Sequence, residues 1–118
     1  MPACWPTELR VDASRSTLAI SFDNGDAVAL PAEYLRVESP SAEVQGHSAA
    51  QKQIVPGKRH VKIVSVEPVG NYAARIIFDD GHDTGLYSWD YLRELGREQN
   101  ARWSTYLSAL RKTGGKRE

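Results

Sequence analysis

The chain has 118 residues, and its 15 Lys+Arg balance its 15 Asp+Glu, which excludes the global basic field that holds a protein on nucleic acid or an anionic membrane. The length suits one domain with one core, and it is too short for a two-lobed enzyme with a cleft between the lobes. A single cysteine, Cys4, excludes an internal disulfide and a zinc site of the usual cysteine-rich kind.

The two ends of the chain suggest an unexported protein with loose termini. The first residues, MPACWPTELRV, contain no basic segment followed by an apolar stretch, and no run approaches the ~20 apolar residues that span a bilayer. The basic sequence LRKTGGKRE is expected to be a frayed, solubilising tail. We therefore predict one cytoplasmic domain over residues 1–118, flexible at 1–6 and 113–118, that binds neither nucleic acid nor membrane.

The first third of the chain predicts three antiparallel strands and a short helix. Apolar and polar residues alternate, as in strands with one buried face, near 7–12, 16–22 and 27–30. Asn24-Gly25 indicates a two-residue type I′ hairpin, since both central residues of that turn need φ > 0. Pro31 suits the first turn of a helix over PAEYLRV, because it lacks only an N–H that has no partner there.

Residues 38–59 are expected to form a long connection. Their sequence, ESPSAEVQGHSAAQKQIVPGKR, has no apolar periodicity and is rich in small, polar and turn-forming residues. Loops longer than roughly 12–15 residues within a compact domain are usually functional or mobile. This long loop is therefore a candidate for function.

The second half returns to strand character and ends in two helices. Strand character returns at Val61, Ile63 and Val64 and leads to Pro68-Val69-Gly70. A second strand is predicted at 72–78, and Asp80-Gly81 turns it back into HDTGLYS. Ser88 is a suitable N-cap for a helix over WDYLREL, which Gly96 ends. The sequence REQNARWSTYLSALRK then places Trp103, Leu107 and Leu110 on one stripe, most simply docked on the sheet. The predicted class is α+β: antiparallel strands and hairpins with a short helix after the first hairpin unit and two C-terminal helices packed on the sheet.

Two segments of the chain echo each other. FDNGDAVALPAEYLR (22–36) and FDDGHDTGLYSWDYLR (78–93) share Phe-Asp-X-Gly, a short strand, and a helix start that ends Tyr-Leu-Arg. The second copy has one extra residue. The echo predicts two hairpin-then-helix units, and it places His82 at the position of Asp26, so the turn itself does not require a histidine.

Few residues can carry chemistry. The sequence has no GxSxG elbow and no GxxxxGK, HExxH or GxGxxG motif, so an enzyme of a familiar class is not expected. Asp79-Asp80-Gly81 is ordinary turn chemistry, whereas a turn does not ask for the imidazole of His82. If His82 meets His47 of the long loop, the two could hold zinc or iron together with nearby carboxylates, for which the candidates are Glu38, Glu43 and Asp83.

Three aromatic residues near the start of the second helical unit suit either a core or a partner surface. Tyr87, Trp89 and Tyr91 belong to residue types that dominate binding hot spots, and they are equally natural in a core. Trp89 and Tyr91 face different sides of a helix, so at least one ring is expected to stay partly exposed. The acidic neighbours of these rings argue against stacking on single-stranded nucleic acid.

Two stretches, LRVESPSAEVQGH (35–47) and EPVGNYAARIIFDDGHDTGLYSWDYL (67–92), carry a resemblance to a known family. They resemble the gamma-butyrobetaine hydroxylase-like N-terminal domain family in its small stand-alone bacterial form, from about Leu9 to Leu107. The resemblance implies relatives fused to the catalytic domain of 2-oxoglutarate-dependent carnitine-pathway hydroxylases, or to Mrp-type ATPases that carry iron–sulfur clusters. Because the 118 residues do not include the hydroxylase domain, it implies no hydroxylase activity.

The same resemblance points to a zinc site in the hydroxylase relatives. There the domain binds a structural zinc through three cysteines in C-x-C-x-x-C spacing after a Leu-Arg dipeptide, and through a histidine on a later hairpin. Leu35-Arg36 matches the dipeptide, His82 matches the histidine, and the cysteines fall on Ser39, Ser41 and Val44. Serine hydroxyls are poor zinc ligands and valine is none, so the tetrahedral site of these relatives cannot form here.

We expect a non-enzymatic accessory domain that engages a protein partner. The predicted partner surface combines the aromatic residues with the loop SPSAEVQGH and comprises Tyr87, Trp89, Tyr91, Ser39 and Glu43. The resemblance suggests an Mrp-type iron–sulfur carrier ATPase as the partner and a link to iron–sulfur cluster or metal handling. The alternative is a domain that binds a divalent metal, zinc or iron, through His82 and His47. A cryptic enzyme with His82 as general base ranks last, since no nucleophile or acid partner is evident.

Overall fold

The computed structural model describes residues 5–45 and 53–118, apart from the side chain of Glu43. The strands are β1 (Pro6–Val11), β2 (Thr17–Phe22), β3 (Ala27–Pro31), β4 (Ile63–Val69), β5 (Ala73–Phe78) and β6 (Leu86–Ser88). The helices are α1 (Ala32–Val37), α2 (Ala42–Gln45), α3 (Trp89–Arg97) and α4 (Gln99–Lys112). The predicted α+β class, with a short helix after the first hairpin unit and two C-terminal helices, is confirmed.

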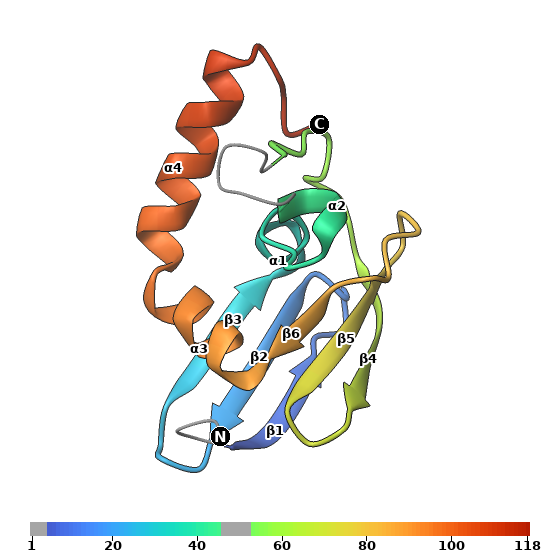
Figure 1. The fold of residues 1–118 in the computed structure, drawn as a ribbon, viewed down its shortest axis with the longest axis vertical. Helices are drawn as coiled ribbons and strands as arrows, with labels where there is room; N and C mark the ends of the chain where they lie inside the picture. Colours follow the sequence, from blue (N-terminus) through green and yellow to red (C-terminus); the bar gives the residue numbers. More distant parts are fainter. Residues whose placement is uncertain (1–4, 46–52) are drawn as a thin grey trace.

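The strands form two three-stranded antiparallel sheets, in the orders β1-β2-β3 and β4-β5-β6 (Figure 1). The central strands β2 and β5 show the alternation of buried and half-buried residues that the sequence predicts. Their buried side chains join those of α1 and α3 in one apolar cluster, which includes Leu18, Ile20, Phe22, Leu35, Ile76, Phe78, Leu92 and Leu95. Since burial of apolar surface stabilises by roughly 25 cal/mol per Å², this cluster is the main force that holds both sheets and both helices together.

The two hairpins turn in the same way, at Phe22–Gly25 and at Phe78–Gly81. In each turn the glycine N–H donates to the phenylalanine carbonyl, at 3.1 Å in the first hairpin and 3.3 Å in the second. The phenylalanine N–H then donates to the carbonyl of the residue after the glycine, at 2.8 and 3.0 Å. The structure therefore confirms that His82 and Asp26 occupy equivalent positions.

The turn type differs from the prediction. Gly25 has a φ of +92° and Gly81 a φ of +90°, while among the described non-glycine residues only Arg15 has a positive φ. Asn24 is therefore not left-handed, and the predicted type I′ turn is wrong. The loop has three residues instead of two, an arrangement that asks for φ > 0 only at the glycine.

The echo in the sequence is a structural repeat. One copy runs β1-β2-β3-α1 and the other β4-β5-β6-α3, each a three-stranded sheet followed by a helix. The first pairing of each copy has an irregularity near the start of its first strand, between Pro6 and Glu8 in β1 and between Ile63 and Ser65 in β4. The repeat therefore extends over the strands as well as the hairpins.

The tyrosines of the two Tyr-Leu-Arg sequences bond to the opposite repeat. The Tyr34 hydroxyl donates to the carbonyl of Leu95 at 2.7 Å, and the Tyr91 hydroxyl donates to the carbonyl of Glu38 at 2.6 Å. Burial raises the pKa of both phenols, to about 12 for Tyr91, so both remain protonated donors at neutral pH. Each repeat thus supplies a donor to the carbonyl that follows the other repeat's arginine by two residues.

The arginines of the same two sequences also cross over. Arg36 Nε lies 2.8 Å from Asp80 Oδ2, in the turn of the second repeat. Arg93 Nη2 lies 2.9 Å from Asp26 Oδ2, in the turn of the first repeat. Each arginine thus pairs with a carboxylate of the other repeat, but the two carboxylates are not equivalent, because Asp80 aligns with Asn24 and Asp26 aligns with His82.

Helix α3 begins where the sequence predicts and continues past its predicted end. The Ser88 hydroxyl accepts a hydrogen bond from the Tyr91 N–H at 3.1 Å, as an N-cap does. Gly96, predicted to end the helix, lies inside it. A Cβ on Gly96 would lie 2.3 Å from Cγ1 of Val28 in β3. The glycine is therefore explained by the close approach of α3 to β3.

Helix α4 packs against α1 and against the segment before β4. The sequence had predicted that this helix would dock on the sheet. Its buried residues Tyr106 and Leu110 form a second apolar cluster with Val37, the last residue of α1. Ile54 and Val55 pack against the same cluster. Figure 1 shows α4 extending away from both sheets.

The segment after α4, predicted as a flexible tail at 113–118, lies along residues 57–59. The N–H groups of Gly57 and Arg59 donate to the carbonyls of Lys116 and Arg117, both at 2.8 Å. Arg117 also pairs with the Glu33 carboxylate through two hydrogen bonds, of 2.7 and 3.0 Å. These contacts join the segment to both α1 and the connection before β4.

The long loop at 38–59 contains one regular element among its described residues, the short helix α2. The serines that precede α2, Ser39 and Ser41, contact His82 of the second repeat. Among residues 5–45 and 53–118, every helix is too short or too polar to span a bilayer.

Candidate functional site

His82 is the centre of the candidate site, and the hairpin turn fixes its backbone. Its carbonyl accepts from the Phe78 N–H at 3.0 Å, and its N–H donates to Oδ1 of Asp80 at 3.0 Å. The imidazole is only 6% exposed and lies beside the Phe78 ring, with 6.1 Å between ring centroids. A histidine placed in this way points into the protein instead of into solvent.

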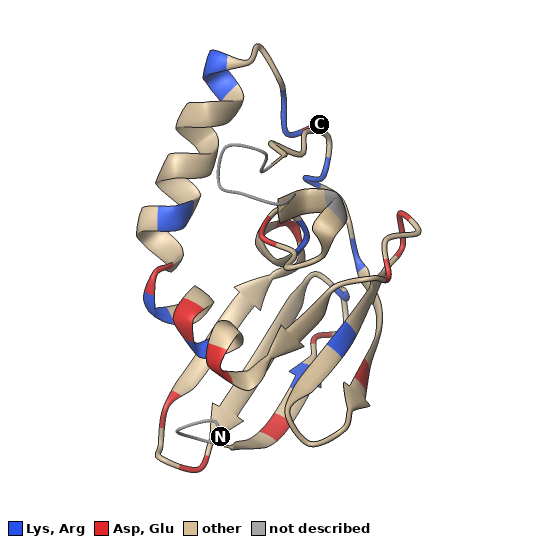
Figure 2. Cartoon of the chain, in the orientation of Figure 1, with Lys and Arg blue, Asp and Glu red and all other residues tan. Residues whose placement is uncertain are grey.

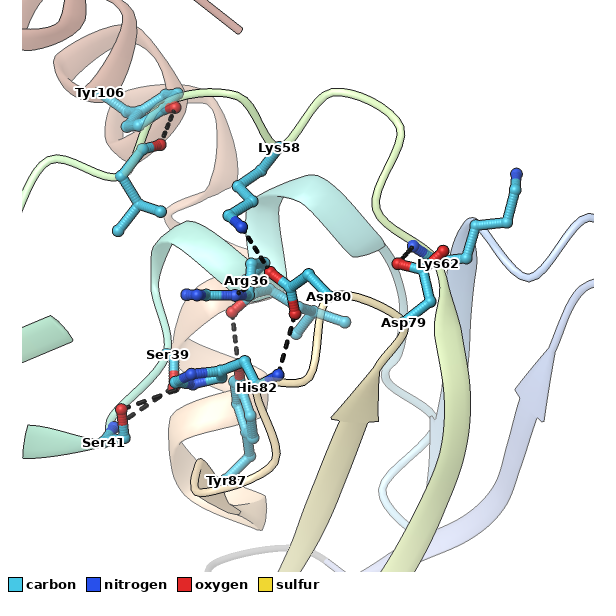
Figure 3. Close-up of polar contacts among 12 residues, drawn as sticks. Arg36, Ser39, Ser41, Lys58, Lys62, Asp79, Asp80, His82, Tyr87 and Tyr106 are labelled. Carbon is cyan, nitrogen blue, oxygen red and sulfur yellow. Dashed lines mark hydrogen bonds and ion pairs between the residues drawn. The ribbon is translucent and has the colours of Figure 1, made fainter. Parts of the chain in front are cut away.

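Two serines from the connection between α1 and α2 meet the imidazole. Ser39 Oγ lies 2.9 Å from His82 Nε2, and Ser41 Oγ lies 3.5 Å from the same atom. Ser39 is 0% exposed and Ser41 is 7% exposed, so the hydroxyls and the imidazole are enclosed together. Figure 3 shows both serines pointing toward His82 from the neighbouring segment. Two segments more than 40 residues apart in sequence are joined here by buried polar contacts.

Ser39, the serine nearer to His82, is held in place by further contacts. Its hydroxyl accepts from the Ser41 N–H at 3.3 Å, and its carbonyl accepts from the Gln45 amide at 2.8 Å. On its other side lies Gly85, where an added Cβ would come within 2.6 Å of Ser39 Oγ and 3.0 Å of the Tyr87 ring. The backbone therefore approaches Ser39 as closely as a glycine allows.

The residues present do not fit a zinc ion. The four positions that the resemblance assigns to the zinc site are His82, Ser39, Ser41 and Val44, of which the first three lie together. Val44 is 2% exposed and has no donor atom, and neutral hydroxyls do not replace thiolates as zinc ligands. Within the described ranges, no group of three His, Cys, Asp or Glu side chains could hold a metal ion. The site is therefore a hydrogen-bond cluster.

Three charged residues, Asp80, Lys58 and Arg36, form ion pairs next to the His82 cluster, and the sequence analysis did not predict them. Asp80 Oδ2 lies 2.7 Å from Lys58 Nζ and 2.8 Å from Arg36 Nε. Partial burial alone would raise the pKa of Asp80, but hydrogen bonds from the Lys58 ammonium, the His82 N–H and Arg36 lower it to about 2. The echo gave no signal for these charges, because it aligns Asp80 with Asn24 and not with Asp26.

Removing the Asp80 charge is expected to destabilise the protein. The pKa of Asp80 is about 2 in the folded chain and ~3.9 in an unfolded one, so its ion pairs stabilise the fold above about pH 4, and this contribution is lost as the pH falls toward 2. Asp80→Asn should lower the free energy of unfolding by on the order of 2 kcal/mol at pH 7, measured by urea denaturation.

Asp83→Asn is the matched control, because Asp83 is exposed in the same loop. It should unfold like the wild-type chain at pH 7. The loss in free energy of unfolding caused by Asp80→Asn, relative to the wild-type chain, should be smaller near pH 3 than at pH 7. An Asp80→Asn deficit that stays constant between pH 7 and pH 3 would contradict the charge-based account.

The structure buries most of the predicted partner surface. Tyr87 and Ser39 are 0% exposed and Trp89 is 5% exposed, so these side chains cannot meet a partner in this conformation. The prediction of a surface role for them is therefore wrong, because the rings fill the core between the repeats. Tyr91 is half-buried, which agrees with the expectation that one ring stays partly exposed. Glu43 belongs to α2, and its side chain lies outside the described part.

Other predicted ligands are not brought to His82. The carboxylate of Glu38 lies 3.4 Å from Arg102 Nη1 and is 5% exposed, which places it in an ion pair with α4. Asp83 is exposed. His47 and Cys4 lie outside the described residues, so the proposed meeting of His47 with His82 stays a prediction.

The family described as "Gamma-butyrobetaine hydroxylase-like, N-terminal" matches residues 9–93. This chain belongs to that family. The match extends from β1 into α3, so it includes both repeats and every residue of the His82 cluster. The matched unit is the N-terminal domain, and no catalytic domain is shown beside it.

Solved structures agree with this membership. Two NMR solution structures, at 43% and 45% identity, superpose with TM-scores of 0.84 and 0.85 and cover 98% and 100% of this chain and 90% of each of those chains. A crystal structure of a protein of unknown function from Acidithiobacillus ferrooxidans, described as a DUF971 family member, is 41% identical, with a TM-score of 0.65 over 77% of this chain and 91% of its own. No curated protein matches. These relatives therefore establish the fold and the family, and their descriptions assign no function.

Proposed function

We propose that this protein is a non-enzymatic accessory domain that binds a protein partner in the cytoplasm. The observation that carries the proposal is the enclosure of His82. Among the described residues, the imidazole that the sequence singles out for chemistry, His82, is 6% exposed and lies 2.9 Å from Ser39 Oγ, so it has no open path to a substrate in this conformation. A domain whose candidate chemical group is sealed in this way acts through its surface.

The partner that we propose is an Mrp-type iron–sulfur carrier ATPase. Support comes from the resemblance described above, since relatives of this domain are fused to such ATPases. A domain that is covalently joined to an ATPase in one protein is a reasonable non-covalent partner of a similar ATPase in another. In this role the domain would contribute to cluster handling by contact with the carrier, without itself ligating metal.

The test is direct binding between the purified domain and the purified Mrp-type ATPase of the same organism, measured by isothermal titration calorimetry. We expect saturable binding with a dissociation constant in the range of about 1–100 μM, as for transient accessory contacts. The titration is repeated with the cluster-loaded and cluster-free carrier. Absence of heat with both forms would overturn the proposal that this ATPase is the partner.

Metal analysis separates this function from the metal-binding alternative. The domain is purified without an affinity tag, dialysed against zinc or ferrous iron, and assayed for bound metal beside His82→Gln. Protein that holds no more metal than His82→Gln supports the accessory role. Stoichiometric metal in the wild-type chain that His82→Gln abolishes would establish a metal site at His82 and contradict the accessory role.

A further inference from the structure

A groove lies between α4 and the segment that follows it. The N–H groups of Gly57 and Arg59 hold that segment through the carbonyls of Lys116 and Arg117. The Arg117 guanidinium also lies 5.4 Å from the centre of the Trp103 ring, in addition to its two hydrogen bonds to Glu33. Main-chain bonds, an ion pair and a ring contact thus fix the wall of the groove opposite α4.

The groove has a volume of about 430 Å³, an apolar floor and basic walls. Its lining comprises Arg59, Leu107, Leu110, Arg111, Gly115, Lys116, Arg117 and Glu118. We call this set the basic groove. Leu110 is buried and Leu107 is half-buried, so the two leucines form the floor. Four of the eight lining residues are cations and one is an anion.

Two cations of the basic groove are not matched by carboxylates. Arg59 pairs with Glu118 at 2.7 Å and Arg117 pairs with Glu33. In the described part of the chain, neither Arg111 nor Lys116 has an ion-pair partner. Figure 2 shows the basic residues gathered at the end of α4, along the C-terminal segment and on the connection before β4. The whole chain has no net charge, so this face is basic at the expense of others.

We propose that the basic groove binds an acidic peptide segment that carries one bulky apolar side chain. This inference rests on the proposed function as a protein-interaction domain and names the chemistry of the partner segment. The apolar side chain would lie on Leu107 and Leu110, and flanking carboxylates would meet Arg111 and Lys116. Guanidinium groups bind carboxylates through paired hydrogen bonds, which gives orientation as well as attraction.

The composition of the groove favours a peptide over a nucleic acid. Two unmatched cations are few beside the six to ten phosphate contacts that roughly typify DNA-binding surfaces. No aromatic ring lines the groove to stack on a base. The apolar floor adds nothing to phosphate binding, whereas it matches the single anchoring side chain that dominates many peptide complexes.

The test is fluorescence anisotropy with a labelled Glu-Glu-Phe-Glu-Glu peptide and the wild-type chain. Binding is expected to weaken by about tenfold when the phenylalanine is replaced by serine, because the apolar contact is lost. It should weaken similarly when the glutamates are replaced by glutamine, and it should fall with rising salt. Equal affinity for all three peptides would overturn the proposal.

Charge reversal locates the site. Arg111→Glu/Lys116→Glu is expected to weaken binding of the glutamate peptide by about tenfold, since two attractive contacts become repulsive. Arg10→Glu is a control for a charge reversal elsewhere, because Arg10 is an exposed cation on β1 and outside the groove; it should bind like the wild-type chain. Circular dichroism checks that each variant is folded. Equal weakening by Arg10→Glu would show a general charge effect and contradict the basic groove as the site.

Two further probes decide the class of ligand. A labelled single-stranded oligonucleotide and anionic phosphatidylserine vesicles are titrated under the same conditions. Tighter binding of either probe than of the glutamate peptide would overturn the proposal in favour of that class. If the peptide binds in the basic groove but the Mrp-type ATPase does not bind the domain, only the proposed partner fails; if the ATPase binds and Arg111→Glu/Lys116→Glu does not weaken it, only the groove fails.

Discussion

Replacing Ser39, Ser41 and Val44 together with cysteine is expected to produce a chain that holds about one zinc ion, with His82 as the fourth ligand. Two of these positions already surround the imidazole, with hydroxyl oxygens 2.9 and 3.5 Å from Nε2. Ligand atoms of a tetrahedral zinc site lie roughly 3.5 Å apart, so little rearrangement is needed at Ser39 and Ser41. Zinc content by mass spectrometry, and the absorption of the cobalt-substituted form, measure the result.

The matched control for this variant is the same triple cysteine chain with His82→Ala. Loss of the fourth ligand should weaken zinc binding, which competition with a chelating dye measures. The wild-type chain, treated in the same way, is expected to take up no stoichiometric zinc. A folded triple variant that remains free of zinc would show that the three positions do not converge on His82, and would contradict the equivalence with the zinc-binding relatives.

Gly96→Ala is expected to lower the free energy of unfolding by about 1–3 kcal/mol, although the same change inside an ordinary helix raises it by about 1 kcal/mol. The reason is the contact with β3, where an added Cβ would meet Val28 Cγ1 at 2.3 Å and Val28 Cβ at 2.9 Å. Cγ1 can move away only if the valine side chain leaves its rotamer, and Cβ can move away only if the strand or the helix shifts. Urea denaturation of both proteins measures the difference.

Val28→Ala supplies the test of cause. It removes Val28 Cγ1 and Cγ2, which lie 2.3 and 3.7 Å from the added Cβ, and leaves Val28 Cβ at 2.9 Å. Gly96→Ala/Val28→Ala should therefore recover part of the stability that Gly96→Ala loses. The two substitutions are then non-additive by about 1 kcal/mol or more, as expected for residues in direct contact. A double variant whose loss equals the sum of the single losses would rule out this contact as the cause.

Local signals in the sequence predicted most of the two repeats. Alternation in the central strands β2 and β5, the Ser88 N-cap and the turn glycines each depend on neighbours within a few residues, and each lies where the sequence placed it. In β1 the predicted buried face is absent, since its four central residues, including Leu9, are exposed. The turn type was mistaken because Asn-Gly fits a type I′ turn and also a longer loop in which only the glycine is left-handed. Local propensity does not distinguish a two-residue turn from a three-residue loop, because the pairing register of the two flanking strands fixes the loop length.

Contacts between distant residues were beyond the reach of the sequence. Arg117 pairs with Glu33 across 84 residues, and no pattern in LRKTGGKRE marks such a partner. The fate of Tyr87 was equally open, because a ring beside a helix start suits a core or a surface until the packing is known. The meeting of His82 with Ser39 was accessible only through the resemblance, which supplied equivalent positions in relatives.

The crossed hydrogen bonds of Tyr34 and Tyr91 have the form of an isologous interface within a single chain. The ion pairs of Arg36 and Arg93 also cross between the repeats, but they reach carboxylates at different repeat positions. In a symmetric dimer isologous contacts come in identical pairs, because both subunits have the same sequence. A substitution therefore changes both contacts at once. Here the two halves are free to diverge, because each position is encoded separately. His82 and Asp26 show the result: one pseudo-symmetric position is sealed beneath two serines, while the other faces solvent and holds an arginine.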